Sequence, residues 1–320
     1  MLPQADEQNY PLLFKTLRTE FHGQDDADIS AMMHENVKSI IWIVESLPKI
    51  NDTHVIYDLC WFLINLTCTQ FDPQGIYAYH LEKTSKLFNI LISCFSEVFK
   101  KFIPLLHLET NPASSDEELN HIIHVSGTLE NILWVFANSL SSLPEEQVSG
   151  MLEKGCYLPV FVSAIDVAID LYDLNSSLFT FLVENLYFLA RSQKKHYAKF
   201  HGCIGQMEKL LTRQLDNHTT VKVVLNLLQA LVDMSDKAIT MVMSRGTQIP
   251  RKLIQILADR RVSPDHKKSA RVILGQIASC ELEDYSPYLV KQGILDALLD
   301  YIRSTMSPKA IPEDYFNKSG

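Results

Sequence analysis

Two tryptophan–asparagine pairs are the residues of this sequence whose types and spacing could do chemistry. Trp61 stands four residues before Asn65, and Trp134 stands four residues before Asn138. Residues four apart share one face of a helix, so each pair would present an aromatic ring beside a carboxamide. An asparagine amide can bond the main chain of an extended peptide, and a tryptophan ring can hold the stem of a lysine or arginine. Each pair is therefore either a candidate peptide site or a core tryptophan beside an incidental asparagine.

No other pattern in the sequence suggests catalysis or metal binding. The chain contains no P-loop, GxGxxG, GxSxG or HExxH motif. The six cysteines form no CxxC pair and mostly lie in apolar runs, which is typical of reduced core residues in a cytosolic or nuclear protein. His121 and His124 lie three apart without a supporting cysteine or carboxylate cluster. We therefore expect no enzyme, no cofactor and no metal, and a location in the cytoplasm and nucleus.

The composition predicts a helical protein with an acidic surface. Of 320 residues, 47% are hydrophobic, and the 11 glycines and 13 prolines are too few for the many turns of an all-β fold. The formal net charge of −9 opposes binding to nucleic acid and suits a basic protein or peptide partner. The N-terminus lacks the features of a signal peptide, and no apolar run approaches the length of a membrane span. Small basic patches such as Lys267-Lys268 and Arg260-Arg261 are expected to be solvated helix ends or loops.

The tryptophan–asparagine pairs fall within segments whose apolar residues recur every three or four positions, which predicts helices. The helices that come third in successive groups of three are expected near 53–68, 117–140, 175–192, 217–234 and 265–280. Between helical segments stand Gly155, Gly202, Gly246 and Gly293, which are separated by 47, 44 and 47 residues. A glycine between two helices fits a sharp corner that needs a positive φ or a close approach of two segments. An all-helical period near 45 residues is typical of an α-solenoid.

Aligning these third helices extends the series beyond the second pair. The next positions are Tyr187 with Arg191, Gln229 with Asp233, and Val272 with Gln276. The step from Trp61 to Trp134 is 73 residues, whereas the last two steps are 42 and 43, so we expect an insertion near 96–120. The chain would then divide into an N-terminal helix and acidic loop at 1–30, a repeat domain at 31–305 and a tail at 306–320.

This arrangement resembles the armadillo repeats of the importin-α family, whose members bind nuclear localisation signals. In that family the third helix of each repeat carries W-x-x-x-N, often with an acidic residue three positions before the tryptophan. Here Asp58 stands three before Trp61, and Glu130 lies next to that offset in the second repeat. The armadillo resemblance covers roughly 30–305, and the tryptophan–asparagine resemblance covers two repeats. It implies an all-α, armadillo-type α-solenoid, a right-handed superhelix of about six three-helix repeats.

The resemblance also implies a function, which is that of a non-catalytic adaptor for nuclear protein import. Its concave groove would hold an extended basic peptide through Trp61, Asn65, Trp134, Asn138, Asp58, Glu130 and Tyr187. The family binds importin-β through a basic N-terminal arm, but residues 1–30 contain only Lys15 and Arg18 as basic residues, so we do not expect importin-β binding. The alternative is an armadillo-repeat scaffold subunit of a larger complex, which binds a folded partner and has no transport role.

Overall fold

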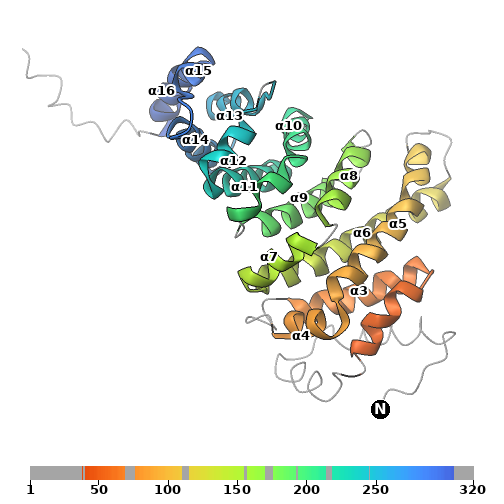
Figure 1. Ribbon diagram of the computed structural model, residues 1–320. Coiled ribbons are helices and arrows are strands. Elements are labelled where there is room, and N and C mark those ends of the chain that lie inside the picture. Colours follow the sequence, from red (N-terminus) through yellow and green to blue (C-terminus); the bar gives the residue numbers. More distant parts are fainter. Residues whose placement is uncertain are drawn as a thin grey trace, which may run out of the picture. The chain divides into compact units, whose positions relative to one another are not determined.

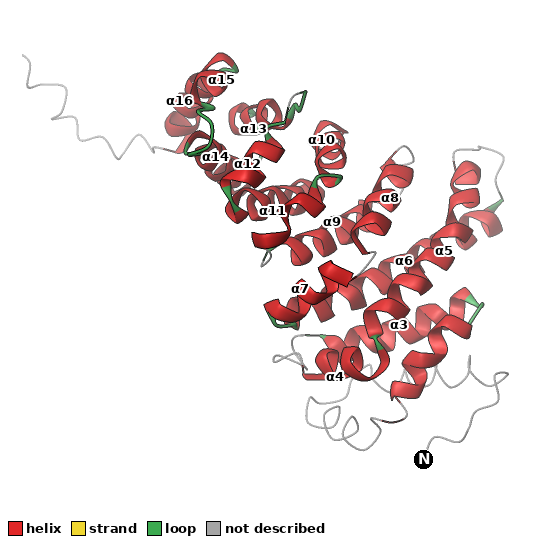
Figure 2. Ribbon diagram, viewed as in Figure 1, coloured by secondary structure: helices red, strands yellow, loops and turns green. Residues whose placement is uncertain are grey.

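The computed structural model describes Lys38 and residues 40–68, 76–109, 115–154, 157–169, 176–191, 194–213, 218–244 and 246–305. Helices make up most of this part of the chain, and it contains no strand (Figure 2). The prediction of an all-α protein is therefore confirmed for these residues. The expected N-terminal helix and acidic loop at 1–30 and the expected tail at 306–320 lie outside them.

The chain forms two compact units, Met1–His196 and Tyr197–Gly320. After helical residues 40–46, the first unit contains η2 (Leu47–Lys49), α3 (Thr53–Thr67), α4 (Ile76–Ser85), α5 (Leu87–Glu109), α6 (Asp116–Ser142), α7 (Glu145–Lys154), α8 (Tyr157–Ile169) and α9 (Ser176–Ala190). The 3-10 helix η4 (Lys194–Phe200) spans the boundary. The second unit contains α10 (Cys203–Arg213), α11 (His218–Met234), α12 (Asp236–Val242), α13 (Ile249–Ala258), α14 (Pro264–Ala278), α15 (Ser286–Lys291) and α16 (Ile294–Thr305).

In the first unit the helices pack in two rows. Helices α3, α6 and α9 lie side by side in chain order, and α5 and α8 form a second row that packs against them (Figure 1). Residues 96–109 belong to α5 and residues 116–120 to α6, which have 23 and 27 residues, and the insertion expected near 96–120 stays a prediction. Helix α6 begins with a capping box in which Ser115 and Glu118 bond each other's main-chain N–H.

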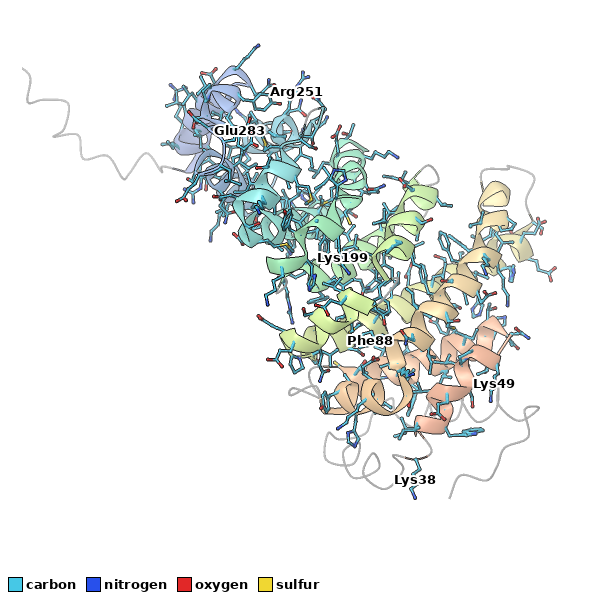
Figure 3. The ribbon with its side chains drawn as sticks, in the orientation of Figure 1. Lys38, Lys49, Phe88, Lys199, Arg251 and Glu283 are labelled. Carbon is cyan, nitrogen blue, oxygen red and sulfur yellow. The ribbon has the colours of Figure 1, made fainter. Side chains whose placement is uncertain are left out.

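Aromatic rings join the two rows of the first unit. Phe136 of α6 packs against Phe88 of α5 and Phe161 of α8, with ring centroids 4.7 Å and 5.2 Å away in edge-to-face arrangements. All three side chains are buried, and Phe88 is labelled in Figure 3. Edge-to-face pairs add directional attraction to the burial of apolar area, so this cluster fixes how α6 is rotated about its own axis.

The second unit repeats this packing. Helices α11 and α14 pair with each other, while α10, α13 and α16 follow one another in a second row. Gln276 of α14 donates a hydrogen bond to the carboxylate of Asp233 on α11, which brings two aligned sequence positions together. The helices α3, α6, α9, α11 and α14 each begin and end within two residues of the ranges expected from the sequence, which is the usual uncertainty of a helix end.

Glycines with positive φ stand at two of the expected corners. Gly246, before α13, has φ 94°, and Gly293, directly before α16, has φ 90°. A side chain at either position would be strained, because the Cβ of an L-residue collides with its own main chain in this region. Gly155 lies outside the described residues.

Replacing Gly293 by alanine should therefore destabilise the protein. We expect Gly293→Ala to lower the free energy of unfolding by about 1–2 kcal/mol. Gly275 is the control, because it is exposed in the last turn of α14, where an added Cβ meets no atom within 4 Å. Gly275→Ala should raise the free energy of unfolding by about 0.5–1 kcal/mol. Urea denaturation measures both, and midpoints that move in the same direction would contradict the corner role.

Candidate functional site

The row of α3, α6 and α9 has one face turned away from α5 and α8. On α6, Trp134 stands two residues before Phe136, which rotates it by about 200° around the helix. Because Phe136 points into the contact with the second row, Trp134 lies on the opposite face, where 38% of its surface is exposed. The open face of this row therefore carries the second tryptophan of the sequence pairs.

Three aromatic rings, one from each helix, form a continuous strip on this face. The rings of Trp61 on α3 and Trp134 on α6 meet edge to face, with centroids 6.2 Å apart. Phe181 of α9 stacks on Trp134 at 5.7 Å. Trp61 and Phe181 are partly exposed. We call Trp61, Trp134 and Phe181 the aromatic strip. Neighbouring rings touch, so a lysine or arginine stem would lie across the strip, not in a slot between two rings.

The asparagines of the two pairs bond to helix carbonyl groups. The Asn138 amide donates to the carbonyl of Ile64 at 3.3 Å, and the Asn65 amide donates to the carbonyl of Trp61 at 3.0 Å. Ile64 is among the last four residues of α3, whose carbonyls have no partner within the helix. Asn138 therefore ties the end of α3 to α6. Asn131, which aligns with Asp58, is buried and donates to the Tyr57 carbonyl across the same contact.

The sequence alignment placed Tyr187 next in the series, but it is Phe181 that extends the strip. The ring of Tyr187 lies beside Phe188, with centroids 5.4 Å apart. Arg191 donates from Nη2 to the carbonyl of Ser141 at 2.7 Å, and its guanidinium lies 5.1 Å from the centre of the Phe188 ring. The Arg191 charge is thus placed at the C-terminal end of α6, where the helix dipole favours a cation.

A sequence signal could have identified Phe181. Phe181 stands four residues before Asn185, as each tryptophan stands before its asparagine. It follows Trp134 by 47 residues, which is also the separation of Gly155 and Gly202. Asn185 is fully buried and donates to the carbonyls of Leu133 and Phe181, so it braces α9 against α6.

Each of the three helices places a partly exposed acidic residue one turn from its strip residue. These residues are Asp58, three before Trp61; Glu130, four before Trp134; and Glu184, three after Phe181. At these spacings the carboxylates share the helix face of the rings. The unit that carries them is strongly acidic, because residues 1–196 contain 12 Lys and Arg against 25 Asp and Glu.

The protonation of Glu130 depends strongly on its surroundings. Burial raises the pKa of its carboxyl group from 4.5 to about 7. A cation placed beside the strip would favour the ionised form, so cation binding and ionisation of Glu130 would reinforce each other.

Histidines line a hollow near the N-terminal ends of α3 and α6. His54 of α3 stacks on His124 of α6, with ring centroids 3.7 Å apart. Burial, and then the nearby charge of His54, lower the pKa of His124. His121 joins them around a hollow of about 650 Å³. Within the described ranges, no group of three or more histidines, cysteines or acidic residues is placed to hold a metal ion.

Comparisons with protein-family models and with curated proteins find no match to this chain. No helix in the described part of the chain is long and apolar enough to cross a membrane. We therefore identify the candidate site from its geometry alone. It combines the aromatic strip with Asp58, Glu130 and Glu184. Such a surface suits long cationic side chains, because the rings accept their stems and the carboxylates attract their charges.

Glu130→Gln should stabilise the protein at alkaline pH. The folded state holds a proton that the unfolded state releases near pH 4.5, so the wild type loses stability as pH rises from about 4.5 through about 7. We expect the variant to exceed the wild type by about 1–2 kcal/mol at pH 8, since partial exposure reduces the effect, and to match it near pH 4.5.

Urea unfolding at the two pH values makes this measurement. Glu117→Gln removes an exposed carboxylate from the first turn of the same helix and is the control. If Glu130→Gln is no more stable than the wild type at pH 8, burial does not raise the pKa of Glu130.

Proposed function

We propose that the protein is a non-catalytic, importin-α-like adaptor that holds an extended basic peptide on the open face of α3, α6 and α9. The observation that carries this proposal is the aromatic strip with one acidic residue from each helix beside it. In a cell such an adaptor would recognise nuclear localisation signals and move between cytoplasm and nucleus.

We further propose that the helices belong to armadillo-type repeats of a right-handed α-solenoid with about six repeats. The helices fall into groups of three, which are α4–α6, α7–α9 and α12–α14. In each of these groups the third helix is the longest. Third helices pack on third helices and second helices on second helices, as in α3 with α6 and α5 with α8. Solenoids are built by this nearest-neighbour packing, and they leave the free face of the third helices, on the concave side, available for a ligand.

The spacing of the strip suits an extended peptide. A β-strand rises about 3.3 Å per residue, so side chains on one face recur about every 6.6 Å. The ring centroids of the strip are separated by 6.2 Å and 5.7 Å. Alternate lysine or arginine stems would then lie on successive rings, with their charges near Asp58, Glu130 and Glu184.

We assign Asn65 and Asn138 two roles in this site. The bond from Asn138 to the Ile64 carbonyl joins α6 to α3 and holds their strip residues in register, whereas the bond from Asn65 to the Trp61 carbonyl lies within α3. An asparagine amide has two N–H groups and an oxygen, so one such bond leaves capacity for the main chain of a peptide. Tyr187 lies next to Phe188 and is assigned to the edge of the site.

Titration with a lysine-rich and arginine-rich peptide of about ten residues tests the proposal. We expect the wild type to bind with micromolar affinity that falls as salt is raised, because the attraction is largely between exposed charges. Trp134→Ala should weaken binding at least tenfold, since it removes the central ring of the strip. Isothermal calorimetry measures both proteins.

Trp42→Ala is the matched control, because Trp42 lies outside the strip and is 37% exposed, against 38% for Trp134. This variant should bind as the wild type does. Absence of binding by the wild type, or equal losses in the two variants, would contradict the adaptor and favour the alternative of a scaffold subunit that binds a folded partner.

A further inference from the structure

The second unit differs from the first in its charge. Residues 197–320 contain 17 Lys and Arg against 13 Asp and Glu, whereas acidic residues predominate by about two to one in the first unit. A basic peptide would therefore not be attracted to the second unit. The lysines and arginines of the second unit must then serve another purpose than binding that peptide.

Several of these cations surround a hollow between α13, α14 and α16. The hollow has a volume of about 420 Å³, within the range of small-molecule sites. Its lining consists of Leu257, Ala258, Arg260, Lys267, Asp300 and Arg303. Three cations and one carboxylate give this lining a net positive charge.

Lys267 is the residue that marks the hollow as a site. It lies near the start of α14, and only 8% of its surface is exposed. Within the described part of the chain, the Lys267 ammonium has neither an ion pair nor a side-chain hydrogen bond. The stem of Lys267 is packed against its neighbours, while its ammonium group is not among the buried polar atoms and lines the hollow, where an anion can reach it.

Two acidic residues near the hollow, Asp259 and Asp300, are paired with arginines, and Asp265 lies in the first turn of α14. Asp259 is held by the guanidinium of Arg261 at 2.8 Å. Hydrogen bonds from Arg261, with the charge of Lys267 further away, lower the pKa of Asp259 to about 2. Asp300 pairs with Arg303 at 3.6 Å. Neither carboxylate neutralises Lys267 by direct contact.

We propose that this hollow binds an oxyanion of the phosphate class, such as phosphate or the diphosphate group of a small molecule. The Lys267 ammonium would bond one oxygen, and the guanidinium groups of Arg260 and Arg303 would bond others with their paired N–H donors. The first turn of α14, which begins at Pro264, adds the partial positive charge of a helix N-terminus. This site is independent of the peptide site proposed for the first unit.

Calorimetric titration of the full chain with sodium pyrophosphate and with sodium phosphate tests this proposal, with sodium chloride at matched ionic strength as the reference. We expect the wild type to bind pyrophosphate with a Kd of about 1 mM or tighter, and phosphate more weakly. Lys267→Met keeps the length of the side chain and removes its charge, and it should weaken binding at least tenfold.

Lys268→Met is the matched control, because Lys268 is the exposed neighbour of Lys267 on the same helix. It should keep its affinity within about twofold of the wild type. Arg260→Gln alters an exposed lining residue, so it tests the site even if Lys267→Met fails to fold, and it should weaken binding severalfold. No binding by the wild type beyond chloride, or equal effects of Lys267→Met and Lys268→Met, would overturn the proposal.

Discussion

The packing of α6 between its neighbours is the interaction on which the first unit depends. This helix contacts α3 on one side, α9 on the other and α5 in the second row. Phe136 is buried against Phe88 and Phe161, and that burial fixes the rotation of α6 about its axis. The same rotation turns Trp134 and Glu130 to the open face. The buried cluster and the candidate site are thus opposite faces of one helix, and a change in the core would displace the site.

Polar side chains then fix the positions of neighbouring helices along their axes relative to one another. Asn138 bonds a carbonyl at the end of α3, and Arg191 bonds a carbonyl at the end of α6. These carbonyls have no partner within their own helices, so the bonds satisfy helix ends and set the register together. The ring contacts of the aromatic strip depend on that register, because a shift of one turn, about 5.4 Å, would separate rings that now touch.

Much of the fold could be predicted from the sequence, whereas parts of the site could not. Apolar periodicity located the helices, and the glycine period located corners that Gly246 and Gly293 occupy with positive φ. The alignment placed Tyr187 where the strip has Phe181, because it did not use the four-residue spacing to an asparagine that Phe181 shares with the two tryptophans. Lys267 appeared in the sequence as half of a solvated basic pair. In the structure it is mostly buried and lines a hollow together with residues of α13 and α16.

The most direct test of the peptide site is an NMR titration of the indole N–H groups. The protein has three tryptophans, so its spectrum should show three indole signals, which substitutions assign to Trp42, Trp61 and Trp134. On addition of a lysine-rich peptide, the signals of Trp61 and Trp134 should move together with one binding constant, while that of Trp42 stays in place. If no signal moves, or if only that of Trp42 does, the aromatic strip is not where a basic peptide binds.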